Sequence, residues 1–356
     1  MTRVLYVGTL QWGSTSLQRM ESLRGCVAHL YATDVRFLQG EYGTRSVWQR
    51  VQLRCGLGGV IRRVSEAVIR DALRYRPDLL WVDQGLAVGA DAMATVRRET
   101  GAFGVHYTAD SLLSPGFGSR TFRAALREYD LCITTKPAEA DLYRRQGAAR
   151  VLLTHQGFDP QIHRPMNLDR VDQQRYGCEV AFVGQRMEAR AASLVTLRRR
   201  LEPRARLHLY GRGWEKRQTG RLLGPLQKGW VAGAEYAKAL CGAKICLAFL
   251  NREVGDVSTT RTFEIPACGA FLLAERTEVH QELFAEGVEA EYFGSDEELI
   301  EKTRWYLARE RERRKIAAAG YVRCQHAGYS WRARMQQCLD ACRSETGGKP
   351  AARRCA

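Results

Sequence analysis

Short apolar runs alternate along this chain with longer stretches in which apolar residues recur at helical spacing. A strand buried on both faces is a near-continuous apolar run, whereas an amphipathic helix repeats every 3.6 residues. Helical spacing is clearest over 14–23 and 60–73. In the first half of the chain, the strand-length runs are 4–7, 27–31, 79–82, 104–107, 131–134 and 151–153. This alternation predicts an α/β fold in which helices cover a parallel sheet.

The alternation stops after residue 156 and then resumes. Gly157-Phe-Asp-Pro160 and His163-Arg-Pro165 contain turn formers, and a polar run continues to Tyr176. Later apolar runs lie at 180–183, 207–210, 245–250 and 271–273. We therefore predict two Rossmann-like domains that face each other across a cleft. Their expected extents are 1–160 for the first domain, 161–176 for a linker, 177–343 for the second domain and 344–356 for a flexible tail.

Composition fits a two-domain protein of the cytoplasm. The 356 residues, of which 45% are hydrophobic, suffice for two cores. No apolar segment approaches the roughly 20 residues that span a bilayer, and the N-terminus lacks a signal-peptide profile. The 11 cysteines occur singly, without a C-x-x-C pair. This spacing argues against zinc and favours reduced thiols that pack as small apolar side chains.

The net charge of +16 points to anionic partners but leaves two interpretations open. Such a field attracts nucleic acid, anionic lipid headgroups or acidic glycans. The arginines are dispersed through helix-like stretches, however, as in Arg198-Arg-Arg200. In the first interpretation, these arginines are only the solvated faces of helices. In the second, they bind a polyanionic acceptor or make peripheral contact with an anionic membrane surface, such as the inner membrane.

The segment from Thr259 to Glu275 combines an arginine, a carboxylate and a glycine stop. A helix over 262–268 would end at Gly269, because glycine closes helices without a Cβ penalty. Glu264 then lies in the first helical turn, with Thr260 and Arg261 just before it. Exposed N–H groups at such a helix start would also donate hydrogen bonds to a phosphate.

Three blocks of this region resemble the C-terminal half of GT-B glycosyltransferases, most closely the bacterial spore-maturation-type members of glycosyl transferase group 1. The first block is Arg261-Thr-Phe-Glu-Ile-Pro-Ala-Cys-Gly269, which fits R-x-F-E-x-x-A-C-G. The second is the acidic loop 286–291, and the third is a helix that begins Asp296-Glu-Glu-Leu299. Segments 180–184 and 207–214 match more loosely. The resemblance implies transfer of a sugar from a nucleotide-sugar donor.

The resemblance also implies roles for particular residues. Seven residues separate Asp256 from Glu264, as in the E-x7-E motif of retaining GT-B enzymes, with aspartate replacing the first glutamate. By this likeness Glu264 would bind the nucleotide ribose and Asp256 the donor sugar. Asp256 could instead stabilise its own turn. In this family a last helix usually returns to the first domain, a role open to 331–342.

Residues that follow strands supply the other candidates, since doubly wound sheets bind ligands beyond their carboxyl ends. Neither Gly56-Leu-Gly-Gly59 nor Gly211-Arg-Gly213 completes the G-x-G-x-x-G fingerprint after a strand, which argues against a nicotinamide dehydrogenase. Backbone amides at Gly184 and Gly211 would approach a diphosphate, and Arg186 or Arg212 would neutralise it. In the first domain, His106 and Asp110 are the candidate polar groups on the sugar or acceptor side. The alternative for His106 is a histidine that only caps its strand.

The leading hypothesis is a retaining hexosyltransferase-like enzyme that acts on an envelope, surface or metabolite acceptor. Without an Asp-x-Asp pair, we expect no metal and no cofactor, the nucleotide sugar being a substrate. A second hypothesis is a non-catalytic basic protein that binds polyanionic glycan or nucleic acid. The third is an enzyme that glycosylates a nucleic-acid base, which the lack of aromatic-basic interleaving disfavours.

Overall fold

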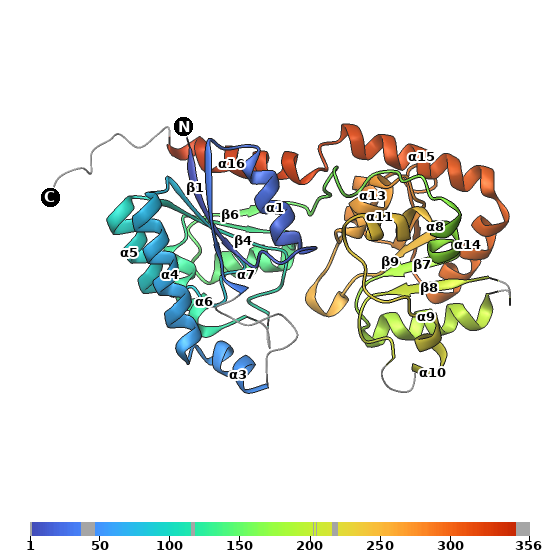
Figure 1. Ribbon diagram of the computed structural model, residues 1–356, viewed down its shortest axis with the longest axis horizontal. Coiled ribbons are helices and arrows are strands. Elements are labelled where there is room, and N and C mark those ends of the chain that lie inside the picture. Colours follow the sequence, from blue (N-terminus) through green and yellow to red (C-terminus); the bar gives the residue numbers. More distant parts are fainter. Residues whose placement is uncertain are drawn as a thin grey trace. The chain divides into compact units, whose positions relative to one another are not determined.

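The computed structural model describes residues 2–36, 47–114, 118–201, 203, 205–215 and 220–346 (Figure 1). The chain divides into two compact units. The first comprises Met1–His155, Glu253–Gly255 and Trp331–Ala356, and the second comprises Gln156–Arg252 and Asp256–Ser330.

The first unit contains a six-stranded parallel sheet with the strand order β2-β1-β3-β4-β5-β6. Its strands are β1 (Arg3–Gly8), β2 (His29–Asp34), β3 (Leu79–Asp83), β4 (Phe103–Thr108), β5 (Leu131–Thr134) and β6 (Val151–Leu153). Its helices are α1 (Thr15–Arg24), α3 (Val47–Cys55), α4 (Gly59–Tyr75), α5 (Ala90–Thr100), α6 (Arg120–Ala125), α7 (Pro137–Arg145) and α16 (Trp331–Thr346).

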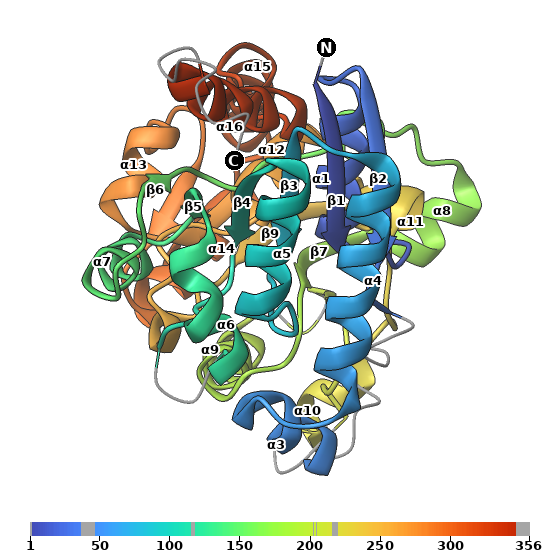
Figure 2. The same cartoon turned by 90° about the vertical axis from the view of Figure 1, so that its left-hand side faces the viewer.

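Successive side chains of each strand point to opposite faces of this sheet. Val4 and Tyr6 of β1 pack with residues of α1 and α16, whereas Leu5 and Val7 pack with α4 and α5. Because side chains alternate along a strand, both faces are apolar and the strand is a continuous apolar run. Figure 2 shows α4 and α5 side by side over the sheet.

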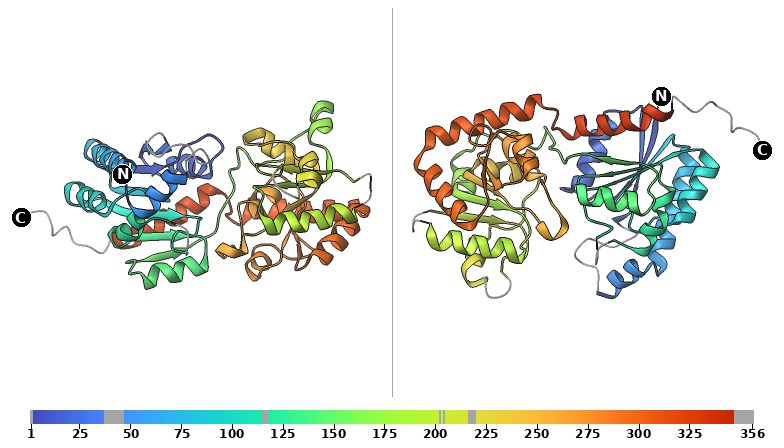
Figure 3. Two further views of the ribbon diagram at one scale, coloured as in Figure 1. Left: turned by 90° about the horizontal axis from the view of Figure 1, so that it is seen from below. Right: turned by 180° about the vertical axis from the view of Figure 1, so that it is seen from behind.

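The second unit contains a five-stranded parallel sheet with the order β11-β10-β9-β7-β8. Figure 3 gives two further views of the ribbon. Its strands are β7 (Cys178–Val183), β8 (Leu207–Tyr210), β9 (Ala243–Ala248), β10 (Leu272–Glu275) and β11 (Glu291–Phe293). Its helices are α8 (Arg170–Tyr176), α9 (Glu188–Arg200), α10 (Gly220–Leu223), α11 (Gly233–Cys241), α12 (Arg261–Ala267), α13 (Glu278–Leu283), α14 (Asp296–Ala308) and α15 (Glu310–His326). Helices α9 and α14 cover one face, and α11, α12 and α13 cover the other.

The two parallel sheets confirm the predicted α/β class and its two Rossmann-like parts. Every predicted apolar run forms a strand, with ends that differ by a few residues. None of the helices in the described part of the chain is long and apolar enough to cross a membrane. The ten cysteines of that part are free thiols, and most are buried.

The units differ from the expected domain extents at the linker and at the last helix, and Glu253–Gly255 also belongs to the first unit. The expected linker is not a separate segment, since α8 packs in the second unit, where Lys238 lies 2.8 Å from Asp172. The second unit also ends at Ser330 and not at 343, because α16 belongs to the first unit. Trp331 is fully buried there, and its indole N–H donates to Gln18 of α1 over 3.1 Å. The segment 331–342 thus makes the return that the resemblance suggested.

Part of the resemblance is explained by a structural ion-pair network in the second unit. Arg276 lies 2.6 Å from both Glu286 and Glu298, which come from the second and third matching blocks. Lys302 of α14 lies within 3.1 Å of the same two carboxylates and of Glu291. These contacts fasten the loop before β11 and the start of α14 to the end of β10.

This network predicts a loss of stability in acid. The hydrogen bond from Arg276 lowers the pKa of Glu286 from its usual 4.5 to about 2. A carboxylate whose pKa is lowered by folding stabilises the fold above pH ~4.5, and this contribution is lost as the pH falls toward ~2. We expect the free energy of unfolding in urea to fall less steeply between about pH 5 and pH 3 in Glu286→Gln than in the wild type. Glu301→Gln, an exposed change on α14, should keep the wild-type slope; equal slopes in all three proteins would contradict the prediction.

Candidate functional site

The loops after β7 and β8 lie side by side in the second unit. The backbone N–H of Gly184 donates to the carbonyl of Tyr210 over 2.8 Å, and that of Arg186 donates to the carbonyl of Arg212 over 3.2 Å. Gly211 has φ +127°, and a Cβ there would collide with the carbonyl oxygen of Gly184. These glycines therefore allow the two loops to touch at the carboxyl end of the sheet.

The close approach makes Gly211 a sensitive position. We expect Gly211→Ala to destabilise the protein by about 3 kcal/mol, since it adds a backbone collision to an unfavourable φ. Gly213→Ala is the matched control, because Gly213 has φ +90° but its Cβ would meet nothing closer than Arg186 at 3.5 Å. That control should cost only about 1 kcal/mol in a urea titration. Equal losses would show that the packing of the loops is not the constraint.

Two arginines come together beside these loops. Arg190 of α9 is 7% exposed, and its guanidinium donates to the carbonyls of Gln185 and Phe249 at 3.4 Å. Burial first, and then the charge of Arg261, lower the pKa of Arg190 to about 10. Over the residues that the structure describes, neither the guanidinium of Arg190 nor that of Arg261 forms an ion pair with a carboxylate. Two nearby cations without a carboxylate partner are suited to an anion.

Unused hydrogen-bond groups occur at the same place. Within the described ranges, the Nε atoms of Arg190 and Arg261 and the hydroxyls of Ser258 and Thr259 are buried without a hydrogen-bond partner. Each such group costs about 1–3 kcal/mol when it stays unsatisfied. Thr260, which is 8% exposed, continues the same turn into α12. A ligand with several acceptor oxygens would satisfy these groups.

Glu264 is held in a fixed orientation inside the second unit. Its carboxylate, 4% exposed, accepts a hydrogen bond from the Tyr236 hydroxyl. His163 lies opposite, with Nε2 3.5 Å from Oε1 of Glu264. The Nδ1 of His163 accepts from the backbone N–H of Asp159 over 2.9 Å, and burial lowers the pKa of the ring. The neutral ring therefore carries its proton on Nε2, toward Glu264.

Asp256 closes a local turn. Its carboxylate accepts from the backbone N–H of Asn251 over 3.0 Å, and its own N–H donates to the carbonyl of Asn251 over 3.1 Å. These contacts match the alternative prediction from the sequence, in which Asp256 stabilises its own turn. Asp256 also lies near enough to Arg190 to raise the pKa of that side chain.

His106 does not lie at a surface. The ring is fully buried among Phe122, Tyr129 and Tyr143, and its Nε2 lies 3.0 Å from the Tyr143 hydroxyl. Burial lowers the pKa of His106 to about 3. The expected role on the sugar or acceptor side is therefore corrected to a neutral core histidine. Asp110, by contrast, is exposed and accepts from the Gln84 amide over 2.5 Å.

The other two predicted arginines differ from Arg190. Arg186 forms a two-point ion pair with Glu188, at 3.0 and 2.8 Å, while Arg212 is exposed. Arg190 was not predicted as a site residue, although it lies only four residues after Arg186. The signal was an arginine in the first turn of the helix that follows a glycine loop. Tyr236 and His163 gave no sequence signal, since they reach Glu264 only through the fold.

Comparisons with known proteins agree with this architecture. A family model described as glycosyl transferase-like matches residues 190–340. No curated protein shows a significant match. Among solved structures, sucrose-phosphate synthase from Thermosynechococcus elongatus has a TM-score of 0.69 at 14% identity, covering 98% of this chain and 100% of that one.

Two further structures extend the comparison. Anabaena HepE in complex with UDP-glucose has a TM-score of 0.66 at 14% identity, covering 97% of this chain and 100% of that one. The lipopolysaccharide outer core galactosyltransferase WaaB, in its apo form, has a TM-score of 0.58 at 12% identity, covering 96% and 99%. At these identities the structures show the fold.

The comparisons define the fold of the whole chain and the family likeness of one segment. The chain has the GT-B fold, and its residues 190–340 match the glycosyl transferase-like family model. Its glycosyl transferase-like segment contains Arg190, Arg261 and Glu264, which form the candidate site.

Proposed function

We propose that the second unit binds a nucleotide-sugar donor and that Arg190 and Arg261 hold its diphosphate. The observation that carries this proposal is the pair of neighbouring guanidiniums, each with a buried Nε that lacks a partner in the described part of the chain. A diphosphate supplies both the charge and the acceptor oxygens that these groups lack. HepE, which shares the fold, was solved with UDP-glucose, and this makes UDP the first nucleotide to test.

In the proposed reaction, the bond from the sugar C1 to the diphosphate oxygen breaks as the acceptor hydroxyl bonds to C1 and passes its proton to an oxygen of the leaving diphosphate. Negative charge builds up on the leaving diphosphate. Arg190 and Arg261 would stabilise that charge without rearrangement, because the fold already holds them in place. We propose that this protein charge makes transfer metal-independent, so activity should persist in EDTA. We also propose retention of the anomeric configuration, which the family resemblance supports.

Glu264 is proposed to bind the ribose hydroxyls of the donor. This proposal is supported by the carboxylate of Glu264, which Tyr236 and His163 keep in one orientation. We expect the wild type to bind UDP about 10-fold more tightly than 2′-deoxy-UDP, since two hydroxyls can donate to one carboxylate. Glu264→Ala should bind both nucleotides with similar, weaker affinity in calorimetric titrations. A variant that kept the wild-type preference would remove Glu264 from the ribose site.

The first unit is proposed to receive the acceptor near the ends of β3 and β4. Exposed Asp110 lies there, and Gln84 beside it has φ +67°, a conformation that non-glycine residues adopt mainly at sites under constraint. The net charge of +16 supports an acceptor or a membrane surface that is anionic. An envelope, surface or metabolite acceptor is consistent with this charge.

A panel of nucleotides tests the donor proposal. We would measure thermal unfolding with UDP, GDP, ADP, TDP and CMP for the wild type, Arg261→Ala and Glu264→Ala. At 100 times its dissociation constant a ligand adds roughly 2.7 kcal/mol to the folded state, so one nucleotide should be distinguished clearly. If no nucleotide stabilises the folded wild type, the non-catalytic hypothesis of polyanion binding replaces this one.

A further inference from the structure

A cavity lies in the second unit at the amino end of the sheet, opposite the loops that follow β7 and β8. It has a volume of about 350 Å³, and its lining includes Cys178, Ala243 and Phe271 at the starts of β7, β9 and β10. Gly184, at the far end of β7, is six residues from Cys178, a separation of about 20 Å along a strand. The cavity is therefore distinct from the donor site.

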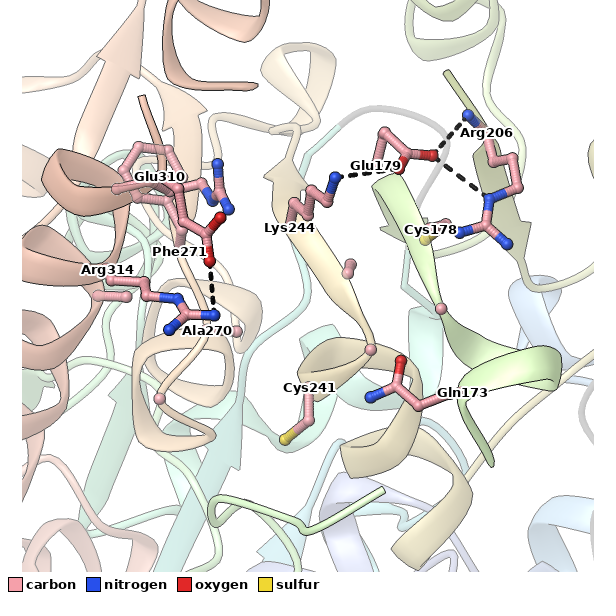
Figure 4. Close-up of a pocket in the computed structure, with 16 residues that line it drawn as sticks. Gln173, Cys178, Glu179, Arg206, Cys241, Lys244, Ala270, Phe271, Glu310 and Arg314 are labelled. Atoms are coloured by element: carbon pink, nitrogen blue, oxygen red, sulfur yellow. Dashed lines mark hydrogen bonds and ion pairs between the residues drawn. The ribbon is translucent and has the colours of Figure 1, made fainter. Parts of the chain in front are cut away.

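Charged residues surround this cavity, and their carboxylates are already paired. Figure 4 shows Glu179 between Lys244 and Arg206 on one side, at 3.2 and 3.4 Å. On the other side, Glu310 pairs with Arg314 at 2.5 Å. Small residues such as Gly242 and Ala270 contribute to the lining between these groups.

Arg313 is the remaining charged residue of the lining. It is 6% exposed, and one N–H of its guanidinium donates to the carbonyl of Tyr306 over 2.7 Å. No carboxylate in the described ranges lies within ion-pair distance of this guanidinium. A buried cation of this kind is costly unless an anion compensates it. Four cations and two carboxylates line the cavity (4 − 2), which leaves an excess of two positive charges.

We propose that this cavity is a second ligand site, which binds a small phosphomonoester through Arg313. A phosphomonoester carries close to two negative charges at neutral pH and offers three acceptor oxygens, so it matches both the excess charge and the unpaired guanidinium. Lys244 and Arg206 also line the cavity and add to its positive charge. Phe271, Ala243 and Ala270 give the body of the ligand an apolar surface. The distance from the donor site makes the ligand an effector and not a substrate.

Glucose 6-phosphate and glucose are the probes for this site, since they differ only in the phosphate. We expect calorimetry to detect binding of glucose 6-phosphate and not of glucose to the wild type. Arg313→Gln should weaken that binding by at least about 10-fold, the loss expected for a charge-assisted hydrogen bond. Arg311→Gln, an exposed change on the same helix, should leave it unaltered. Arg261→Ala should also bind normally, which separates this cavity from the donor site.

Two further measurements keep the test decisive. Lys244→Gln removes a half-exposed cation, so it should fold even if Arg313→Gln does not, and it should also weaken binding. Inorganic phosphate that competes with glucose 6-phosphate would support recognition of the phosphate group itself. The proposal is overturned if the wild type does not bind glucose 6-phosphate, or if Arg311→Gln loses as much affinity as Arg313→Gln or Lys244→Gln.

Discussion

Arg190→Met is expected to weaken binding of the donor nucleotide by about 100-fold and to leave the protein at least as stable as the wild type. Arg190 is a buried cation with two long hydrogen bonds to carbonyls and a nearby like charge at Arg261. Replacing such a group by an apolar side chain of similar length removes a desolvation cost. The same change removes a charge-assisted contact to the diphosphate.

The opposite signs of these two effects make the test specific. Calorimetry with UDP gives the affinity, and urea unfolding gives the stability. Arg199→Met, on the exposed side of the same helix, should change neither quantity by much. Wild-type affinity in Arg190→Met would contradict the donor site, whereas lower stability with unchanged affinity would make Arg190 a structural residue.

Asp83→Ala is expected to lower the free energy of unfolding by about 4 kcal/mol, because it leaves a buried guanidinium without its counter-charge. Arg19 and Asp83 form a two-point ion pair at 2.8 and 3.0 Å, and both side chains are less than 5% exposed. The Tyr6 hydroxyl donates to the same carboxylate over 2.5 Å. The guanidinium also lies over the Trp331 ring, 5.2 Å from its centroid, so the pair helps to hold α16 on the first unit.

An exposed ion pair on α1 provides the control. Arg24 and Glu21 are both about half exposed at 3.1 Å, and Arg24→Met should cost less than about 1 kcal/mol. The double variant Arg19→Met/Asp83→Leu should recover part of the loss, because no unpaired charge stays buried. A loss below about 1 kcal/mol in Asp83→Ala would show that the pair does not anchor this unit.

The sheets could be predicted because parallel strands buried on both faces are continuous apolar runs. Val4 to Val7 illustrates this, since alternate residues enter two different cores and all four are apolar. Strand β11 escaped prediction because it has only three residues and begins with Glu291, whose charge is compensated by Lys302. The position of α16 also needed tertiary information, since its apolar residues fit either unit.

The candidate site was predicted in part, for a physical reason. Arg261 and Glu264 could be recognised because one helix start contains both of them. His106 was misplaced because the aromatic residues that bury it, Phe122 and Tyr143 among them, lie far along the chain. The same distance in sequence hid the approach of Arg190 to Arg261, because these residues come from helices that cover opposite faces of the sheet.

Release of a nucleoside diphosphate from nucleotide sugars tests the central claim most directly. The purified protein would be incubated with UDP-glucose and with the corresponding GDP, ADP and TDP sugars, beside Arg261→Ala. We predict that the wild type releases the diphosphate from one of these donors faster than buffer alone and that Arg261→Ala loses this activity. No release from any donor, or equal release by the variant, would contradict a donor site at Arg190 and Arg261.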